Sequence, residues 1–199
     1  MARLSENNSF ESSSDYFESY VDDMVGIINL KGDVFKMTTD LSLKETYFSR
    51  IKLAYHLPEI KVLLILSGTS ALGEEKLDQF IRSITESADG KLKLVREENA
   101  LFDFIRLIYS SNKIVVLGVR GSVIGAFLGA ILAADHRVAS ENTLFSFPSA
   151  KQELLSLRAL TFFLRQYVGI VKTKNILFGG DSIPASKALE LGLVYDVVA

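Results

Sequence analysis

The chain has 199 residues, 48% of them hydrophobic, and 22 basic against 24 acidic side chains leave a formal net charge of −2. This length predicts one domain with a sizeable core, and the charge balance does not indicate a nucleic-acid-binding surface. The sequence contains no cysteine, which excludes disulfides and thiolate metal sites, and its two histidines do not suggest a metal centre. We find no apolar run of membrane-spanning length and no signal-peptide pattern, so we expect a cytoplasmic protein without a membrane partner.

Strands and helices are predicted to alternate along the chain. Residues 1–15 are polar and rich in Ser, Asn and Glu, which predicts a flexible tail ahead of a single domain over residues 16–199. Apolar runs predict strands over residues 25–30, 34–37 and 61–66, and periodicity predicts helices over 41–56, 74–85 and 97–111, with 91–95 as a charged connection. Further strands are predicted over residues 114–119, 137–139, 144–145 and 194–198, and further helices over 125–135, 154–167, 171–178 and 184–191. This alternation is typical of a parallel α/β sheet.

The stretch from residue 113 to 148 carries the most informative local pattern. A buried strand over residues 114–119 leads through a glycine-containing turn at 120–122 into an apolar helix. Small residues recur along that helix at Gly125, Ala126, Gly129, Ala130, Ala133 and Ala134. They would let another backbone or a ligand come close, and a tightly packed buried helix would need them equally. A helix start of this kind can also bind an anion, because free N–H groups and the helix dipole meet there.

Two segments of the chain resemble a known family. They read KIVVLGVRGSVIGAFLGAILAADHRVASENTLFSFP and, nearer the end, LRQYVGIVKTKNILFGGDSIPASKALELGLVYDVV. In their order and spacing they resemble the crotonase (enoyl-CoA hydratase/isomerase) superfamily, and the likeness extends from about residue 25 onward. The resemblance implies an α/β fold built as a ββα spiral, which Clp-type proteases share, and assembly into a homotrimer or a hexamer. The family's C-terminal helical segment is expected to be absent or truncated, because the chain stops after its GLV motif.

The resemblance also implies a site that needs few side chains. Members of the family bind an acyl-CoA or acyl-carrier thioester and stabilise an enolate oxyanion with two backbone N–H donors aimed at the developing charge. Laid over this sequence, the family pattern assigns one donor to Ala126, which follows Gly125. The second donor is Glu74, which follows Gly73. Glu74 and its neighbour Glu75 could equally be ordinary first-turn residues of a helix. Phe127 departs from the pattern, because it adds bulk where the family keeps the helix start bare.

The acids of a standard hydratase are missing from the expected positions. Hydratases of the family activate water with two glutamates, and the corresponding residues here are Gly129 and Ser149. Together with Gly73, Gly125 and Phe127, these two residues are the candidate substrate contacts. Glu153 is the nearest carboxylate and is either a functional acid or a solvated residue at a helix start. The basic residues that could meet the CoA phosphates are Lys31, Lys36 and Arg120.

Three functions remain open at this point. The first is an enzyme acting on acyl thioesters, such as an isomerase, a decarboxylase or a hydratase-like lyase, with acyl-CoA as substrate or ligand and no separate cofactor. The second is a non-catalytic crotonase-fold protein for binding or assembly. The third is a Clp-type serine protease, which would need a serine and a histidine where this chain has Val123 and, near the proline, Ser146 and Phe147.

Overall fold

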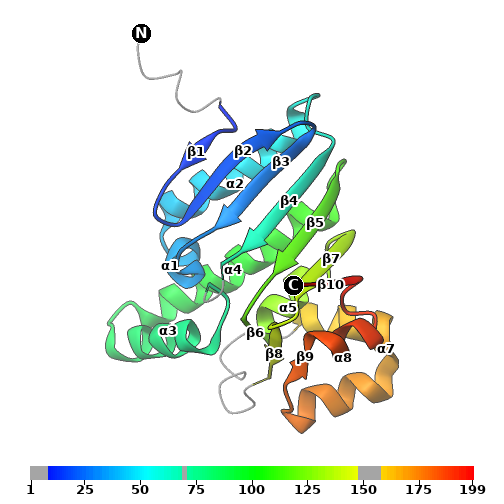
Figure 1. Ribbon diagram of the computed structural model, residues 1–199. Helices are drawn as coiled ribbons and strands as arrows, with labels where there is room; N and C mark the ends of the chain where they lie inside the picture. The colour runs from blue at the N-terminus through cyan, green and yellow to red at the C-terminus, as the bar shows by residue number, and fades with distance from the viewer. Residues whose placement is uncertain (1–8, 69–70, 148–157) are drawn as a thin grey trace.

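The computed structural model describes residues 9–68, 71–147 and 158–199. In this part of the chain a seven-stranded sheet has the order β1-β2-β3-β4-β5-β7-β10 (Figure 1). Strands β1 to β3 pair antiparallel, and every pair from β3 to β10 is parallel. The bounds are β1 Ser12–Ser13, β2 Phe17–Asp22, β3 Val25–Leu30, β4 Val62–Ser67, β5 Ile114–Val119, β7 His136–Ser140 and β10 Asp196–Val198. The predicted parallel α/β core is confirmed, with an antiparallel hairpin added at its edge.

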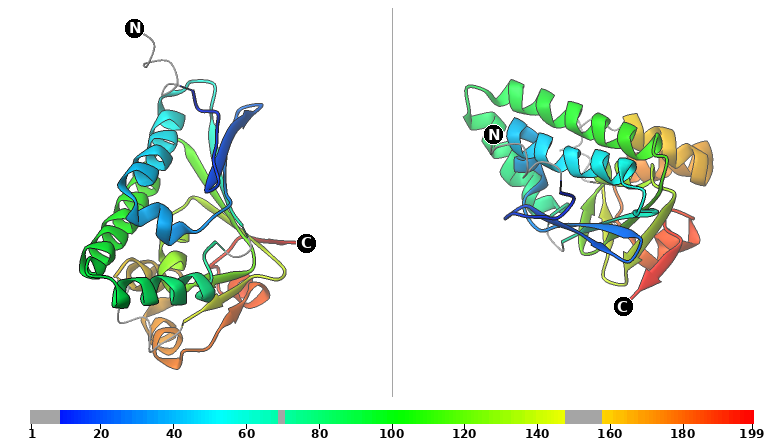
Figure 2. Two further views of the ribbon diagram at one scale, coloured as in Figure 1. Left: turned by 90° about the vertical axis from the view of Figure 1, so that its left-hand side faces the viewer. Right: turned by 90° about the horizontal axis from the view of Figure 1, so that it is seen from above.

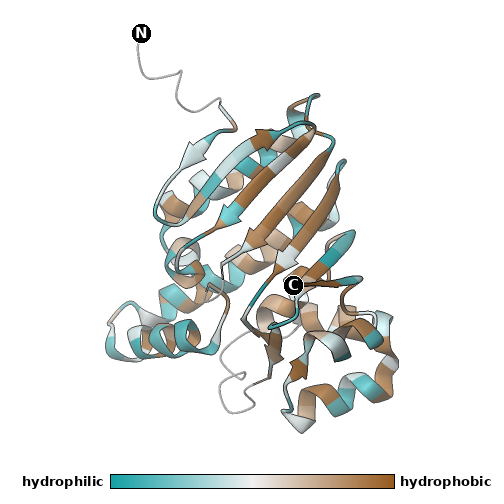
Figure 3. Ribbon diagram, in the orientation of Figure 1, coloured by the Kyte–Doolittle hydropathy of each residue, from teal (hydrophilic) through white to brown (hydrophobic). Residues whose placement is uncertain are grey.

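Helices pack on one face of this sheet, as the left view of Figure 2 shows. The central strands consist mainly of hydrophobic residues (Figure 3), and those turned toward the helices, such as Ile28, Leu63 and Leu117, are buried. Their neighbours along each strand point to the opposite face and are half-buried, except at the exposed start of β5. The helices in the first two thirds of the chain are α1 Val34–Thr39, α2 Leu41–His56, α3 Glu74–Glu86, α4 Gly90–Tyr109 and α5 Gly125–Ile131.

A smaller unit follows the main sheet. Three short strands, β6 (Ser122–Ile124), β8 (Leu144–Ser146) and β9 (Ile183–Pro184), form a second sheet in the order β6-β8-β9. Helix α7 (Arg158–Gly179) breaks at Gly169, whose φ of 77° is outside the helical region, and α8 covers Ala185–Glu190. This confirms the predicted interruption between two helices. None of the described helices combines the length and hydropathy that a membrane crossing requires.

Three predicted elements differ from the structure. Residues 34–37 belong to helix α1 and not to a strand, because the side chain of Asp33 caps that helix and accepts a 3.0 Å hydrogen bond from the backbone of Phe35. The supposed connection 91–95 is the first part of α4, where Lys93 pairs with Asp89 at 3.1 Å. The helix predicted over 125–135 ends at Ile131 and continues as turns.

The N-terminal boundary also lies earlier than predicted. Phe10 is 4% exposed, and its carbonyl accepts a 2.5 Å hydrogen bond from the hydroxyl of Ser19 in β2. Ser12 pairs with Ser19 across the β1–β2 ladder. The described part of the segment that was expected to be a tail therefore packs on the sheet.

Candidate functional site

The starts of α3 and α5 lie next to each other, although they are far apart in the sequence. The backbone N–H of Ile124, just before α5, donates a 2.9 Å hydrogen bond to the carbonyl of Leu72, just before α3. A Cβ atom on Gly73 would lie 3.1 Å from the Cβ of Ser122. Gly73 therefore lets the two segments approach closely, and we call this contact the helix-start junction.

The two predicted oxyanion donors belong to this junction. Glu74 is the first residue of α3, and Ala126 is the second residue of α5. The first N–H groups of a helix have no partner inside it and lie at the positive end of its dipole. The junction thus brings together the helix starts that carry both predicted donors, as a shared oxyanion site requires, and the pairing itself stays a prediction.

The small residues of α5 serve close packing against α7. A Cβ atom on Gly129 would lie 2.6 Å from the backbone nitrogen of Leu160, and one on Gly125 would lie 2.9 Å from the ring of Phe147. Contacts under 3.0 Å are not found for real Cβ atoms, so any side chain at Gly129 would force Leu160 to move. The position where a hydratase carries its first glutamate therefore has no room for one.

Phe127 points into the core and not away from it. Its ring is 5% exposed and lies 5.3 Å from the ring of Phe35, measured between centroids. Phe35 in turn stacks on Phe80 at 4.7 Å. The large side chain at the start of α5 therefore packs in an aromatic cluster with one ring from α1 and one from α3.

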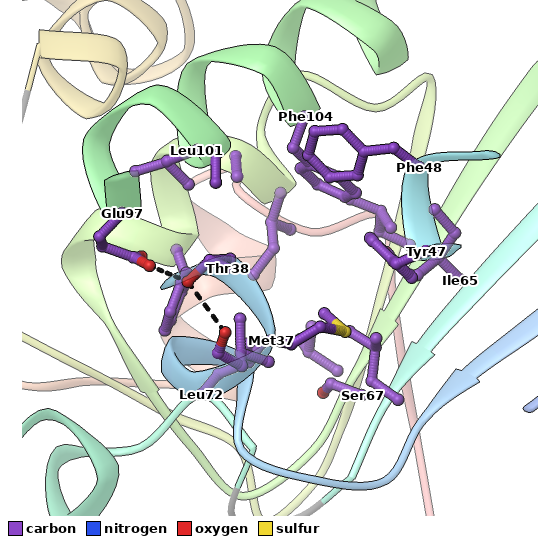
Figure 4. A pocket seen from close by; sticks show the side chains of 18 of the residues that line it. Met37, Thr38, Tyr47, Phe48, Ile65, Ser67, Leu72, Glu97, Leu101 and Phe104 are labelled. Carbon is purple, nitrogen blue, oxygen red and sulfur yellow. Dashed lines mark hydrogen bonds between the residues drawn. The ribbon is translucent and has the colours of Figure 1, made fainter. Parts of the chain in front are cut away.

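A cavity of about 70 Å³ lies on the Phe127 side of α5. Its walls come from β3, β4, β5, α1, α2, α4 and α5, together with Leu72 of the helix-start junction. Figure 4 shows the side chains from α1, α2 and α4 that converge on it. Most of the lining is aliphatic or aromatic, and the polar exceptions are Thr38, Tyr47, Ser67 and Glu97. The cavity is therefore an apolar space with a few polar groups on its walls.

Glu97 is the most unusual of these groups. It lies on α4, is 2% exposed, and is hydrogen-bonded to the hydroxyl of Thr38, whose O–H group is also within hydrogen-bond distance of the carbonyl of Val34, at 3.0 Å. Burial raises the pKa of Glu97 to about 8, while the Thr38 hydrogen bond lowers it and the charge of Asp33 adds a smaller increase. The carboxyl is therefore mostly protonated at neutral pH, and it is available as a donor or an acceptor.

Comparison with known proteins identifies the family. The family model described as enoyl-CoA hydratase/isomerase matches residues 84–199, which is more than half of the chain. The chain belongs to this family. Among curated relatives, the trans-2-decenoyl-[acyl-carrier-protein] isomerase of Streptococcus mutans is 34% identical over 85 residues, or 43% of this chain, and human chromodomain Y-like protein 2 is 26% identical over 135 residues, or 68%. The matches span only 32% and 27% of these two relatives.

Solved structures of the family share the fold. Human enoyl-CoA hydratase domain-containing protein 3 superposes with a TM-score of 0.73 at 20% identity, over 92% of this chain and 70% of that one. The enoyl-CoA hydratase of Bacillus halodurans gives a TM-score of 0.71 at 21% identity, over 92% and 72%. The chain therefore has the crotonase fold that the sequence resemblance predicted.

The basic residues predicted to meet CoA phosphates are engaged locally. Lys31 forms an ion pair with Glu18, and the ammonium of Lys36 lies 5.5 Å from the ring centroid of Tyr16, whose hydrogen bond raises the pKa of Lys36. Arg120 is exposed after β5 and lines a groove on the face of the sheet that the helices leave open. A CoA-binding role for the two lysines would require them to exchange these partners.

Two predicted site residues, Ser149 and Glu153, lie outside the described residues.

The protease alternative gains no support from the described histidines. His136 pairs with Val116 early in β5, stacks on Tyr195 and contacts Asp196 at 2.9 Å. The serine beside Val123, which is Ser122, follows the other end of β5, so this histidine is not placed to activate it as a nucleophile.

The interpretation of the sequence missed Glu97, although a signal was present. In a helix, side chains three or four residues apart share a face. Leu94, Leu101, Phe104 and Ile108 recur at that spacing and form the buried face of α4, and Glu97 falls in the same row. A carboxyl within an apolar stripe is the pattern that would have marked it.

Proposed function

We propose that this protein binds an acyl thioester at the helix-start junction and stabilises the enolate form of the thioester with the backbone N–H groups of Ala126 and Glu74. The observation that supports this most directly is the hydrogen bond from Ile124 to Leu72, which joins the two helix starts. Backbone donors held by a sheet and two helices are preorganised for a developing negative charge. The backbone donors would stabilise the enolate, and an isomerase such as the one named among the relatives also needs a group that takes up and returns the proton, for which Glu153 is the candidate from the sequence.

The reaction is not that of a standard hydratase. Water addition in this family needs two positioned carboxylates, and one of the two positions is Gly129, whose Cβ position is filled by the backbone of Leu160. The second candidate function is a crotonase-fold protein that binds or assembles without catalysis. The same packing favours it, because α7 occupies the space in which the acid would lie.

A proline placed in the first turn of α5 tests the proposal. Ala126→Pro removes one donor, and a proline there is tolerated because that N–H has no helical partner. Lys91→Pro is a matched control, since Lys91 is exposed, is the second residue of α4 and also follows a glycine. Binding of crotonyl-CoA and of its unreactive thioether analogue would be measured by titration calorimetry.

We expect the thioester to bind the wild-type chain and the Lys91→Pro chain equally. Binding to the Ala126→Pro chain should be about tenfold weaker or more, which is the effect of losing one hydrogen bond to a charged or strongly polarised oxygen. Equal affinity in a folded Ala126→Pro chain would show that this helix start is only a scaffold. That result, combined with measurable binding, would mean that the thioester binds elsewhere in the molecule.

A further inference from the structure

The cavity on the Phe127 side of α5 contains polar groups that the fold leaves unused. The hydroxyl of Tyr47 and the hydroxyl of Ser67 are fully shielded from solvent and have no hydrogen-bond partner among the described residues. Tyr47 is 3% exposed, Ser67 is 6% exposed, and both line the cavity. Buried hydroxyls are almost always paired, so these two indicate a hydrogen-bonding partner that the protein itself does not supply.

The walls restrict what a guest can be. Among the described residues that line the cavity there is no Lys, Arg or His, so an anion would find no counter-charge. Glu97 is protonated at neutral pH and already hydrogen-bonded to Thr38, so a cation would first have to remove its proton. The rest of the lining is aliphatic and aromatic, which favours an uncharged guest with a hydrocarbon body.

The volume sets the size of the guest. A dry apolar cavity of about 150 Å³ holds benzene, and this cavity measures about 70 Å³. About half of the benzene-sized volume holds about three non-hydrogen atoms, so two carbon atoms with one hydroxyl group are the upper range. Such a guest can donate to one orphan hydroxyl oxygen and accept from another, because an alcohol group does both.

We propose that this cavity is a binding site for a small uncharged alcohol, held by the hydroxyls of Tyr47 and Ser67 and by the apolar walls that α1, α2, α4 and α5 contribute. The site borders the helix-start junction, because Leu72 is part of its wall, but the hydroxyls proposed to hold the guest belong to α2 and β4 and not to either helix start. It is independent of whether the chain turns over a thioester.

The experiment is a titration of the full chain with ethanol at about pH 6.5, followed by methyl NMR spectra. Ethylammonium and acetate serve as charged probes of similar length. The methyl groups of Met37, Ile65 and Leu101 line the cavity, and those of Ile183 and Leu193 are buried away from it and report general solvent effects.

Four variants complete the design. Tyr47→Phe and Ser67→Ala each delete one orphan hydroxyl, and both should fold because they remove an unpaired polar atom. Tyr55→Phe is the matched control, since its hydroxyl lies on the same helix but donates to the carbonyl of Leu107 at 2.9 Å. Ala100→Val fills part of the cavity, because Ala100 lines it and is fully buried.

We expect saturable shifts for ethanol that are confined to the cavity methyls, and no such shifts for the charged probes. Affinity should fall roughly fivefold in Tyr47→Phe or Ser67→Ala, the usual effect of one hydrogen bond, stay unchanged in Tyr55→Phe, and be lost in Ala100→Val. Shifts that never saturate, tighter binding of ethylammonium, or unchanged affinity in both hydroxyl deletions would each overturn the proposal. The second of these results would show a cation site on ionised Glu97.

Discussion

Raising the pH should destabilise this fold, because Glu97 stays protonated inside it. Burial raises the pKa of Glu97 from 4.5 to about 8. Between these values the unfolded chain releases a proton that the folded chain keeps, so the free energy of unfolding falls as the pH rises. The slope is about 1.4 kcal/mol per pH unit, which sums to at most roughly 5 kcal/mol. This stabilisation is fully present below pH 4.5 and is lost as the pH rises through 8.

Urea unfolding followed by circular dichroism, at pH values from about 4.5 to 9, measures this loss. Glu97→Gln keeps the shape of the side chain but is neutral at every pH, so its unfolding free energy should lack this slope. Subtracting the variant from the wild type cancels the titration of all other groups. Glu98→Gln, at the neighbouring position on α4, controls for the change in net charge. A wild-type-minus-variant difference that stays constant across the range would refute the buried neutral carboxyl.

Three further outcomes are expected. Crotonyl-CoA hydration should remain at background in a spectrophotometric assay, and Gly129→Glu should unfold at lower urea instead of gaining activity, because Leu160 occupies the space. Arg137→Lys should lower the free energy of unfolding by about 2–4 kcal/mol in the same assay, since Arg137 is fully buried and its guanidinium lies 4.5 Å from the rings of both Tyr167 and Tyr195. Sedimentation at micromolar concentration should give a trimer, because α7 exposes large apolar side chains, and a clean monomer would contradict this.

The central strands and α2 were predictable because their sequence patterns leave little choice. The runs at β4 and β5 are short and apolar, the β5 run is also rich in β-branched residues, and α2 has one apolar face that ends shortly before a proline. The break in α7 was also predictable, since Gly169 interrupts two apolar helical segments. In these places local propensity and tertiary packing favour the same structure.

The elements that were missed depend on partners that are distant in the sequence. Half of the residues of strand β2 are polar, and it becomes a strand because Phe17 to Asp22 pair residue by residue with β3. Residues 34–37 contain β-branched and aromatic side chains, and the cap from Asp33 decides for a helix. Glu97 was missed for a different reason, because a carboxyl is assigned to the solvent side unless the whole helical row is considered.

The small residues of α5 show how one pattern served two interpretations. The sequence allowed either a close-packed helix or space for a ligand. In the structure, close packing and open space lie on different faces of α5. Gly125 and Gly129 face Phe147 and Leu160, so on that side the missing side chains make room for protein. On the other side Phe127 lines the cavity, whose walls are mostly apolar and whose acidic residue, Glu97, is mostly protonated at neutral pH. The thioester site proposed at the start of this helix depends on its backbone, which is why the loss of a single N–H group is the decisive test.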